Sequence, residues 1–139
     1  MVDAYLWAAD ATTEDGDHVI AHLIQKLEEA GIPIVPVIGY DRWENEVYKA
    51  GMKGLTLPSN RSTCLRLDSH AIQDVAEPKF FQDCIAEIVD GLGLFPSRCS
   101  ILIDFGDVSS TSLSDLTDGA SSIIRRLEPF GFRDFITAG

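Results

Sequence analysis

Short apolar runs alternate along the chain with longer amphipathic segments, and this alternation limits the folds that the sequence can adopt. The runs occupy residues 4–9, 32–38, 62–67, 99–105 and 132–138. Runs of this length are typical of strands covered on both faces, as in parallel sheets flanked by helices. We therefore expect an α/β fold with a mainly parallel sheet, built from four right-handed βα units and a fifth strand, as part of a barrel or of a wound sheet.

The segments between these runs carry apolar residues at the spacing of one helix face. The first helix, through residues 19–30, is expected to follow a cap at Thr12, Thr13 or Asp15 and to end at Gly31. Further helices are expected at 43–50, capped by Asp41 and ended by Gly51, at 78–90, ended by Gly91, and at 113–127, where Ser112 and Asp115 match a capping box. The connection 68–77 is expected to be a polar crossover, with or without one helical turn. Residues 53–61 are expected to be a loop, with or without one extended piece at 54–57.

Composition narrows the class of protein. With 139 residues, of which 45% are apolar and 24% charged, the chain fits one α/β domain over residues 1–139, either alone or as part of a longer barrel. No apolar run reaches the roughly 18 residues of a membrane span. The first residues lack the basic start of a signal peptide, so a cytoplasmic protein is expected. The formal net charge of −11 would repel a phosphate backbone, and direct nucleic-acid binding is not expected.

Motifs of common catalytic and cofactor sites are missing from the sequence. It has no G-x-S-x-G elbow, no G-x-G-x-x-G loop that opens a helix and no P-loop lysine. Cys64, Cys84 and Cys99 lie in apolar segments without C-x-x-C spacing, which predicts buried free thiols. His18 and His22 have the spacing of two metal ligands on a helix, but no third ligand accompanies them. We therefore expect no metal site and no cofactor.

Polar residues follow or end several of the expected strands. In parallel βα folds the ligand site lies beyond the carboxyl ends of the strands. Carboxylates there could bind a divalent cation, and arginines there could hold an anionic group. The alternative is that strand ends simply tolerate polar residues. The residues expected at these ends are Asp10, Tyr40, Asp41, Arg42, Asp68, Asp104 and Asp107, with Arg66 just inside, and the candidate ligand-binding set is Asp10, Arg42, Arg66, Asp104 and Asp107.

Arg66 and Asp104 are the most specific pair in this set. Each is a charged residue inside an otherwise apolar run, and the two runs are expected to be neighbouring strands. An isolated buried charge is costly, so we expect the two side chains to pair within the sheet. The pair is either a structural ion pair that fixes strand register or part of a functional site, and the sequence leaves both open.

Three segments together resemble a known family. They are residues 34–42 (IVPVIGYDR), residues 64–67 (CLRL), and residues 91–96 (GLGLFP) leading into residues 101–106 (ILIDFG). Their order and spacing are similar to the central part of the phage-type Beta family, whose members are longer. The resemblance implies a TIM-like barrel and an association with phage exclusion or host–phage conflict. It implies no defined reaction. The chain would then be a central segment, a shortened relative, or a half that pairs with another chain.

Two functions remain open at the level of sequence, and whether the chain is an enzyme is not decided. The first is a phage or defence-associated interaction protein that acts on a protein partner through an acidic surface. The alternative is a TIM-barrel-like enzyme, or the remnant of one, that binds a small anionic ligand at the strand carboxyl ends. Five strands cannot close an eight-stranded barrel, so the terminal strands should leave exposed edges. We expect a homodimer or another protein chain at these edges, with residues 133–138 in contact with something outside this sequence.

Overall fold

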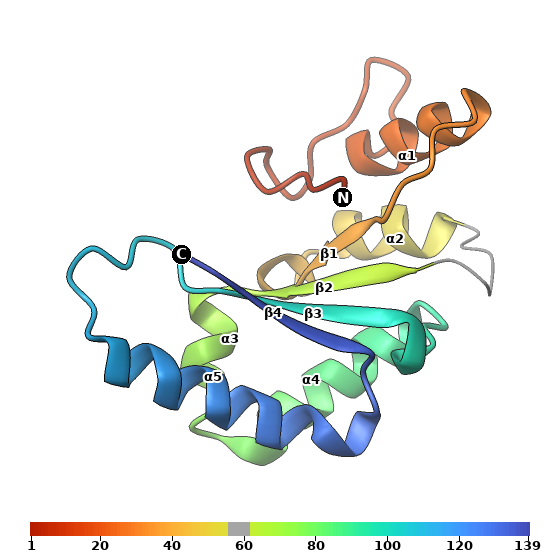
Figure 1. Cartoon of the computed structure of the whole chain (residues 1–139). Helices are drawn as coiled ribbons and strands as arrows, with labels where there is room; N and C mark the ends of the chain where they lie inside the picture. The colour runs from red at the N-terminus through yellow and green to blue at the C-terminus, as the bar shows by residue number, and fades with distance from the viewer. Residues whose placement is uncertain (56–61) are drawn as a thin grey trace.

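The computed structural model describes residues 1–55 and 62–139, which form a four-stranded parallel sheet flanked by helices (Figure 1). The strands are β1 (Val37–Gly39), β2 (Thr63–Leu67), β3 (Cys99–Asp104) and β4 (Asp134–Ala138), in that order across the sheet. The helices are α1 (Val19–Glu29), α2 (Glu46–Gly54), α3 (Ser69–Asp74), α4 (Pro78–Gly91) and α5 (Leu113–Leu127), with short 3-10 turns η1 (Tyr40–Arg42), η2 (Pro96–Arg98) and η3 (Glu128–Phe130). The predicted α/β class and parallel sheet are confirmed. Membership of a barrel stays a prediction, and most of the predicted loop at 53–61 lies outside the described residues.

The two faces of the sheet have different neighbours. Leu65, Leu67, Ile101 and Ile103 are fully buried on the face that α3, α4 and α5 cover (Figure 1). Alternate residues of a strand point to opposite faces, so the residues between these point away from those helices. We call this second side the open face. Its residues, aligned by the strand register, are Cys64, Ser100 and Asp134, then Arg66, Leu102 and Ile136, then Asp104 and Ala138.

The strand predicted at residues 4–9 is wrong. These residues form turns, and Leu6 and Trp7 are 85% and 47% exposed. The ladder-type contact of this segment is made before it, where Val2 forms an isolated parallel bridge with Pro36. Apolarity alone suggested burial, but the edge of β1 offers few donors because Pro33 and Pro36 lack N–H groups. The sheet therefore has four strands among the described residues.

The segment around β1 and α2 also departs from expectation. The strand expected at 32–38 is reduced to Val37–Gly39. The helix expected after it begins later, because Asn45 rather than Asp41 caps it by accepting hydrogen bonds from the N–H groups of Val47 and Tyr48, each at 3.0 Å. Gly51 does not end the helix, which continues to Gly54.

α4 and α5 follow the sequence closely, and α3 occupies most of the predicted crossover at 68–77. Pro78 occupies the first turn of α4, as expected from its fixed φ and missing donor. The predicted Ser112 cap of α5 is confirmed, since its hydroxyl accepts a hydrogen bond from Asp115 N–H at 3.1 Å. The Asp115 carboxylate accepts from the Ser112 hydroxyl at 2.7 Å. The cap predicted for α1 at Thr12, Thr13 or Asp15 is wrong, because α1 begins at Val19 and its N-cap is His18, whose side chain makes no capping hydrogen bond. None of the described helices is long and apolar enough to cross a lipid bilayer.

Candidate functional site

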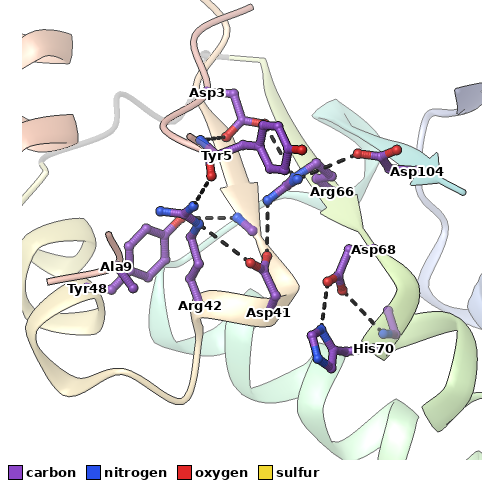
Figure 2. A network of polar contacts seen from close by, with 12 residues as sticks. Asp3, Tyr5, Ala9, Asp41, Arg42, Tyr48, Arg66, Asp68, His70 and Asp104 are labelled. Atoms are coloured by element: carbon purple, nitrogen blue, oxygen red, sulfur yellow. Dashed lines mark hydrogen bonds and ion pairs between the residues drawn. The ribbon is translucent and has the colours of Figure 1, made fainter. Parts of the chain in front are cut away.

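Arg66 is the centre of a polar cluster at the carboxyl end of the sheet (Figure 2). It lies on β2 between Gly39 of β1 and Leu102 of β3, and it is only 3% exposed. A guanidinium this deeply buried needs anionic partners to offset its lost hydration. The surrounding chain supplies three carboxylates, one from each of three separate segments.

The three carboxylates approach different edges of the guanidinium. Asp41 Oδ1 accepts a hydrogen bond from Arg66 Nη2 at 3.1 Å. Asp104 Oδ2 lies 3.6 Å from Nη1, and Asp3 Oδ2 lies 3.3 Å from Nε, although Nε lacks the alignment of a hydrogen bond. The predicted pairing of Arg66 with Asp104 is therefore confirmed, and it is the longest of the three contacts.

Asp41 links this centre to a second arginine. It follows β1 in η1, and its Oδ2 lies 3.6 Å from Arg42 Nε. Burial raises the pKa of the Asp41 carboxyl above its usual value, while the charge of Arg66 acts in the opposite direction. The cluster therefore holds a carboxylate whose ionisation depends on its arginine neighbours.

The N-terminal segment covers the cluster. Arg42 is 8% exposed and donates a hydrogen bond from Nη2 to the Tyr5 carbonyl at 2.5 Å. The Tyr5 ring lies over the guanidinium of Arg66, 4.7 Å from its Cζ, in the geometry of a cation–π contact. Two arginines thus hold residues near the N-terminus against the open face.

Neighbouring polar groups are paired within the chain as well. Asp68 caps α3 by accepting from Ala71 N–H, and its other oxygen lies 2.8 Å from His70 Nδ1. The Tyr48 hydroxyl accepts a hydrogen bond from Gly39 N–H at 3.1 Å, and burial raises the pKa of Tyr48 to about 12. The backbone on both sides of the Arg66 cluster is therefore fixed by side chains of the chain itself.

A model of the Beta protein family matches residues 1–139. The chain belongs to the Beta protein family. The match gives no support to the expectation that these residues are the central segment of a longer member. No curated protein and no solved structure matches the chain at a significant level.

In this Beta protein family member, the structure brings together three of the five predicted ligand-binding residues. Arg42, Arg66 and Asp104 belong to the cluster. Asp10 is exposed in the N-terminal segment outside it. Asp107 is exposed in the loop after β3, where its carboxylate accepts a hydrogen bond from Ser109 N–H at 2.9 Å, and that bond lowers its pKa.

Asp3 and Tyr5 are members of the cluster that the sequence did not suggest. Both precede or lie within the apolar run that was expected to be a strand, so no strand end was expected near them. No spacing rule relates them to Arg66, which is more than 60 residues away in the printed sequence. Among residues 1–55 and 62–139, no group of His, Cys, Asp or Glu side chains is arranged to hold a metal ion.

A hollow of about 470 Å³ lies among η1, α3 and α4, beside the cluster. Trp43 and Phe80 line it together with Asp74 and Glu87. Both carboxylates are already bonded, Asp74 to the Tyr40 hydroxyl at 2.9 Å and Glu87 to Trp43 Nε1 at 3.0 Å. Burial also raises the pKa of the Cys84 thiol at this hollow.

Proposed function

We propose that this chain is an interaction protein that binds a basic protein partner through an acidic surface. The observation that carries the proposal is the charge of one continuous stretch. From Asp104 to Ile124 the chain contains four aspartates and no Lys, Arg or His. This stretch runs from the end of β3 through most of α5. A surface of one sign attracts and orients a partner of the opposite sign. The aspartates are Asp104, Asp107, Asp115 and Asp118.

The engagement of the two site arginines supports the same proposal. Arg66 is in contact with three carboxylates, and Arg42 with the Tyr5 carbonyl and Asp41. A small anionic ligand would have to displace these internal partners before it reached either guanidinium. The alternative, a barrel-like enzyme acting on such a ligand, therefore has less support than a cation-attracting surface.

The biological setting is part of the proposal. The sequence resemblance implies a phage or defence context, and we propose that the partner is encountered there. We place the interaction in the cytoplasm, a reducing compartment that suits the free thiols of Cys64, Cys84 and Cys99. The partner is defined by its chemistry, a protein surface rich in Lys and Arg.

A charge-change experiment tests this function. The variant Asp107→Asn with Asp118→Lys makes the stretch less acidic, and the asparagine side chain keeps an oxygen that can accept the Ser109 N–H. The control is Asp10→Asn with Asp15→Lys, the same charge change on the exposed N-terminal segment. The partner is captured by crosslinking, identified, purified, and titrated calorimetrically with each variant at about 50 mM and about 300 mM salt.

The expected result is an affinity that falls at least about tenfold with added salt and about tenfold in the first variant, with the control within about threefold of the unmodified chain. Salt-insensitive binding, or equal effects of both variants, would count against an acidic docking surface. Thermal stabilisation by a phosphate ester with magnesium, together with failure to capture a basic protein, would favour the small-ligand alternative.

A further inference from the structure

The hollow beside the Arg66 cluster has walls that carry more negative than positive charge. Its volume of about 470 Å³ is typical of a small-ligand pocket. Its lining residues lie between Tyr40 and Ile88, in the two consecutive βα units that begin with β1 and β2. η1 and α3 follow these strands directly, at the end of a parallel sheet where ligands bind. The charged lining consists of four carboxylates, one lysine and one histidine: Asp41, Glu44, Asp74, Glu87, Lys49 and His70.

Two of the four carboxylates have oxygens left to accept hydrogen bonds. Glu44 is exposed, and no hydrogen bond or ion pair joins its side chain to another residue in the described part of the chain. Asp74 accepts from the Tyr40 hydroxyl through Oδ2 at 2.9 Å, while its Oδ1 accepts from no described donor. Asp41 and Glu87 already contact an arginine and a lysine of the chain (Figure 2 shows the first). Glu44 and Asp74 are therefore the acceptors that an incoming cation would meet.

Aromatic rings give the same hollow a second reason to attract cations. Trp43 is 4% exposed, and two ammonium groups of the chain lie over its ring, Lys49 Nζ at 5.6 Å and Lys53 Nζ at 5.8 Å from the centroid. The negative face of an aromatic ring holds cations in this way. Phe80, at the start of α4, is 46% exposed, and no cation of the described residues lies over its ring. Phe80 therefore offers a ring face to a cation from outside.

We propose that this hollow receives an arginine side chain of the basic partner protein. The guanidinium binds between the carboxylates of Glu44 and Asp74, and its plane stacks on Phe80. Arginine fits better than lysine, because its planar fork of five N–H donors can serve carboxylates while its face lies on a ring. An anionic group would instead be repelled by the four carboxylates. This inference rests on the proposed function and names the chemical group of the partner that is recognised.

The test uses short peptides, so it needs no identified partner. Blocked tripeptides carry arginine, lysine or citrulline between two glycines, and citrulline has the shape of arginine without its charge. Each peptide is titrated into the ¹⁵N-labelled full chain at about 50 mM salt and followed by amide chemical shifts. We expect a dissociation constant on the order of 1 mM for arginine, binding at least about fivefold weaker for lysine and none for citrulline. The shifted amides should cluster around the hollow, between residues 40 and 88.

Three variants locate the bound arginine. Glu44→Gln removes one charge and Phe80→Leu removes the ring, each at an exposed position. Asp74→Asn removes the second charge and keeps an oxygen that can accept from the Tyr40 hydroxyl. The matched control is Glu128→Gln, an exposed glutamate in η3, which precedes β4 and so lies toward the other end of the sheet. We expect each of the three to weaken the arginine peptide at least about threefold and the control to leave it unchanged.

The outcomes separate this inference from the proposed function. Equal binding of the arginine peptide to Glu44→Gln, Phe80→Leu and the control, or no binding at about 10 mM peptide, overturns the arginine site. The acidic surface still stands in that case if Asp107→Asn with Asp118→Lys weakens the captured partner. Tighter binding of butylguanidine than of the peptide would assign the hollow to a small organic cation instead. If Asp74→Asn fails to fold, the other two variants decide.

Discussion

Arg66 connects segments that are far apart in the sequence. Its three carboxylates come from the N-terminal segment, from η1 and from the end of β3. Each carboxylate side chain is between 23% and 30% exposed, whereas Arg66 is 3% exposed. The arginine therefore bears most of the desolvation, and the aspartates remain in partial contact with water.

Replacing Arg66 by Met should destabilise the fold, because the arginine offsets the repulsion among its three carboxylate partners. We expect Arg66→Met to lower the free energy of unfolding at pH 7 by about 3 kcal/mol, because three carboxylates lose a shared cation. The positive charge of Arg66 lowers the pKa of Asp41, so the loss of Arg66 raises that pKa further. The folded variant then binds more protons than its unfolded chain, so its stability should recover as the pH falls from 7 toward 5. Urea unfolding at several pH values measures both effects.

Arg66→Lys is the matched comparison, because it keeps the positive charge but replaces the planar guanidinium. A lysine keeps the cation but cannot reach three carboxylates in one plane, so we expect a loss of about 1–2 kcal/mol. A Met variant as stable as the unmodified chain at every pH would mean that the cluster does not hold the sheet and the N-terminal segment together.

The burial of the Tyr48 hydroxyl leads us to predict a loss of stability at alkaline pH. Burial raises the pKa of Tyr48 from 10.0 to about 12, so between these values the folded state keeps a proton that the unfolded chain releases. Stability must then fall as the pH rises through this window, by on the order of 2 kcal/mol in total. Tyr48→Phe should make the decline between about pH 10 and 12 shallower in urea unfolding. An unchanged slope would mean that other groups, Tyr40 first among them, cause the loss of stability at alkaline pH.

Among the elements, α1 and α2 meet at an unusually close contact. A Cβ built on Gly51 would lie 2.5 Å from His18 Cβ and 2.6 Å from its Cγ. His18 is itself buried, with Nε2 2.9 Å from the Ala9 carbonyl and its ring edge-on to Tyr48. Gly51 is therefore required in mid-helix by the approach of its neighbour, which explains why it does not end α2.

Gly51→Ala tests this close contact. The added methyl must push α2 away from His18, and we expect a loss of about 2 kcal/mol or more in the free energy of unfolding. Gly54→Ala, in the same helix, meets nothing within 4 Å and should be neutral or stabilise by up to about 1 kcal/mol. Equal thermal midpoints for the two variants would show that the helices separate without cost.

A helix or strand could be predicted from the sequence where its signals are local, and was missed where its fate depends on residues far away in the chain. β2, β3, α4 and α5 were expected near their observed positions because their patterns and caps are local. Residues 4–9 and the length of β1 were missed because an apolar run cannot reveal that the neighbouring edge carries prolines. The Arg66–Asp104 pair was expected from charge inside strands, whereas Asp3 reaches Arg66 only through the path of the N-terminal segment.

At the scale of the whole molecule, charge opposes self-association. The net charge is −11 at pH 7 and the isoelectric point is about 4.5. We expect the isolated chain to sediment as a monomer at pH 7 and to associate near pH 4.5, where the repulsion between copies is lost.

Ile136→Lys tests whether the open face takes part in this association, since Ile136 is 40% exposed on that face. The control is Val47→Lys, which is 45% exposed on α2 and changes the charge equally. We expect Ile136→Lys to reduce the sedimentation coefficient near pH 4.5 more than Val47→Lys. Equal effects would attribute the association to charge alone.

The sequence by itself determined the α/β class, the parallel sheet, the central strands, the long helices and the strong negative charge, because these depend on periodicity, capping and composition within short stretches. Only the tertiary structure decided that the N-terminal segment folds over the sheet, that Arg66 has three carboxylate partners, and that an apolar groove lies between the end of β4 and α5. Those features depend on contacts between residues distant in the chain. A local pattern records the tendency of a segment but not the partner that it meets.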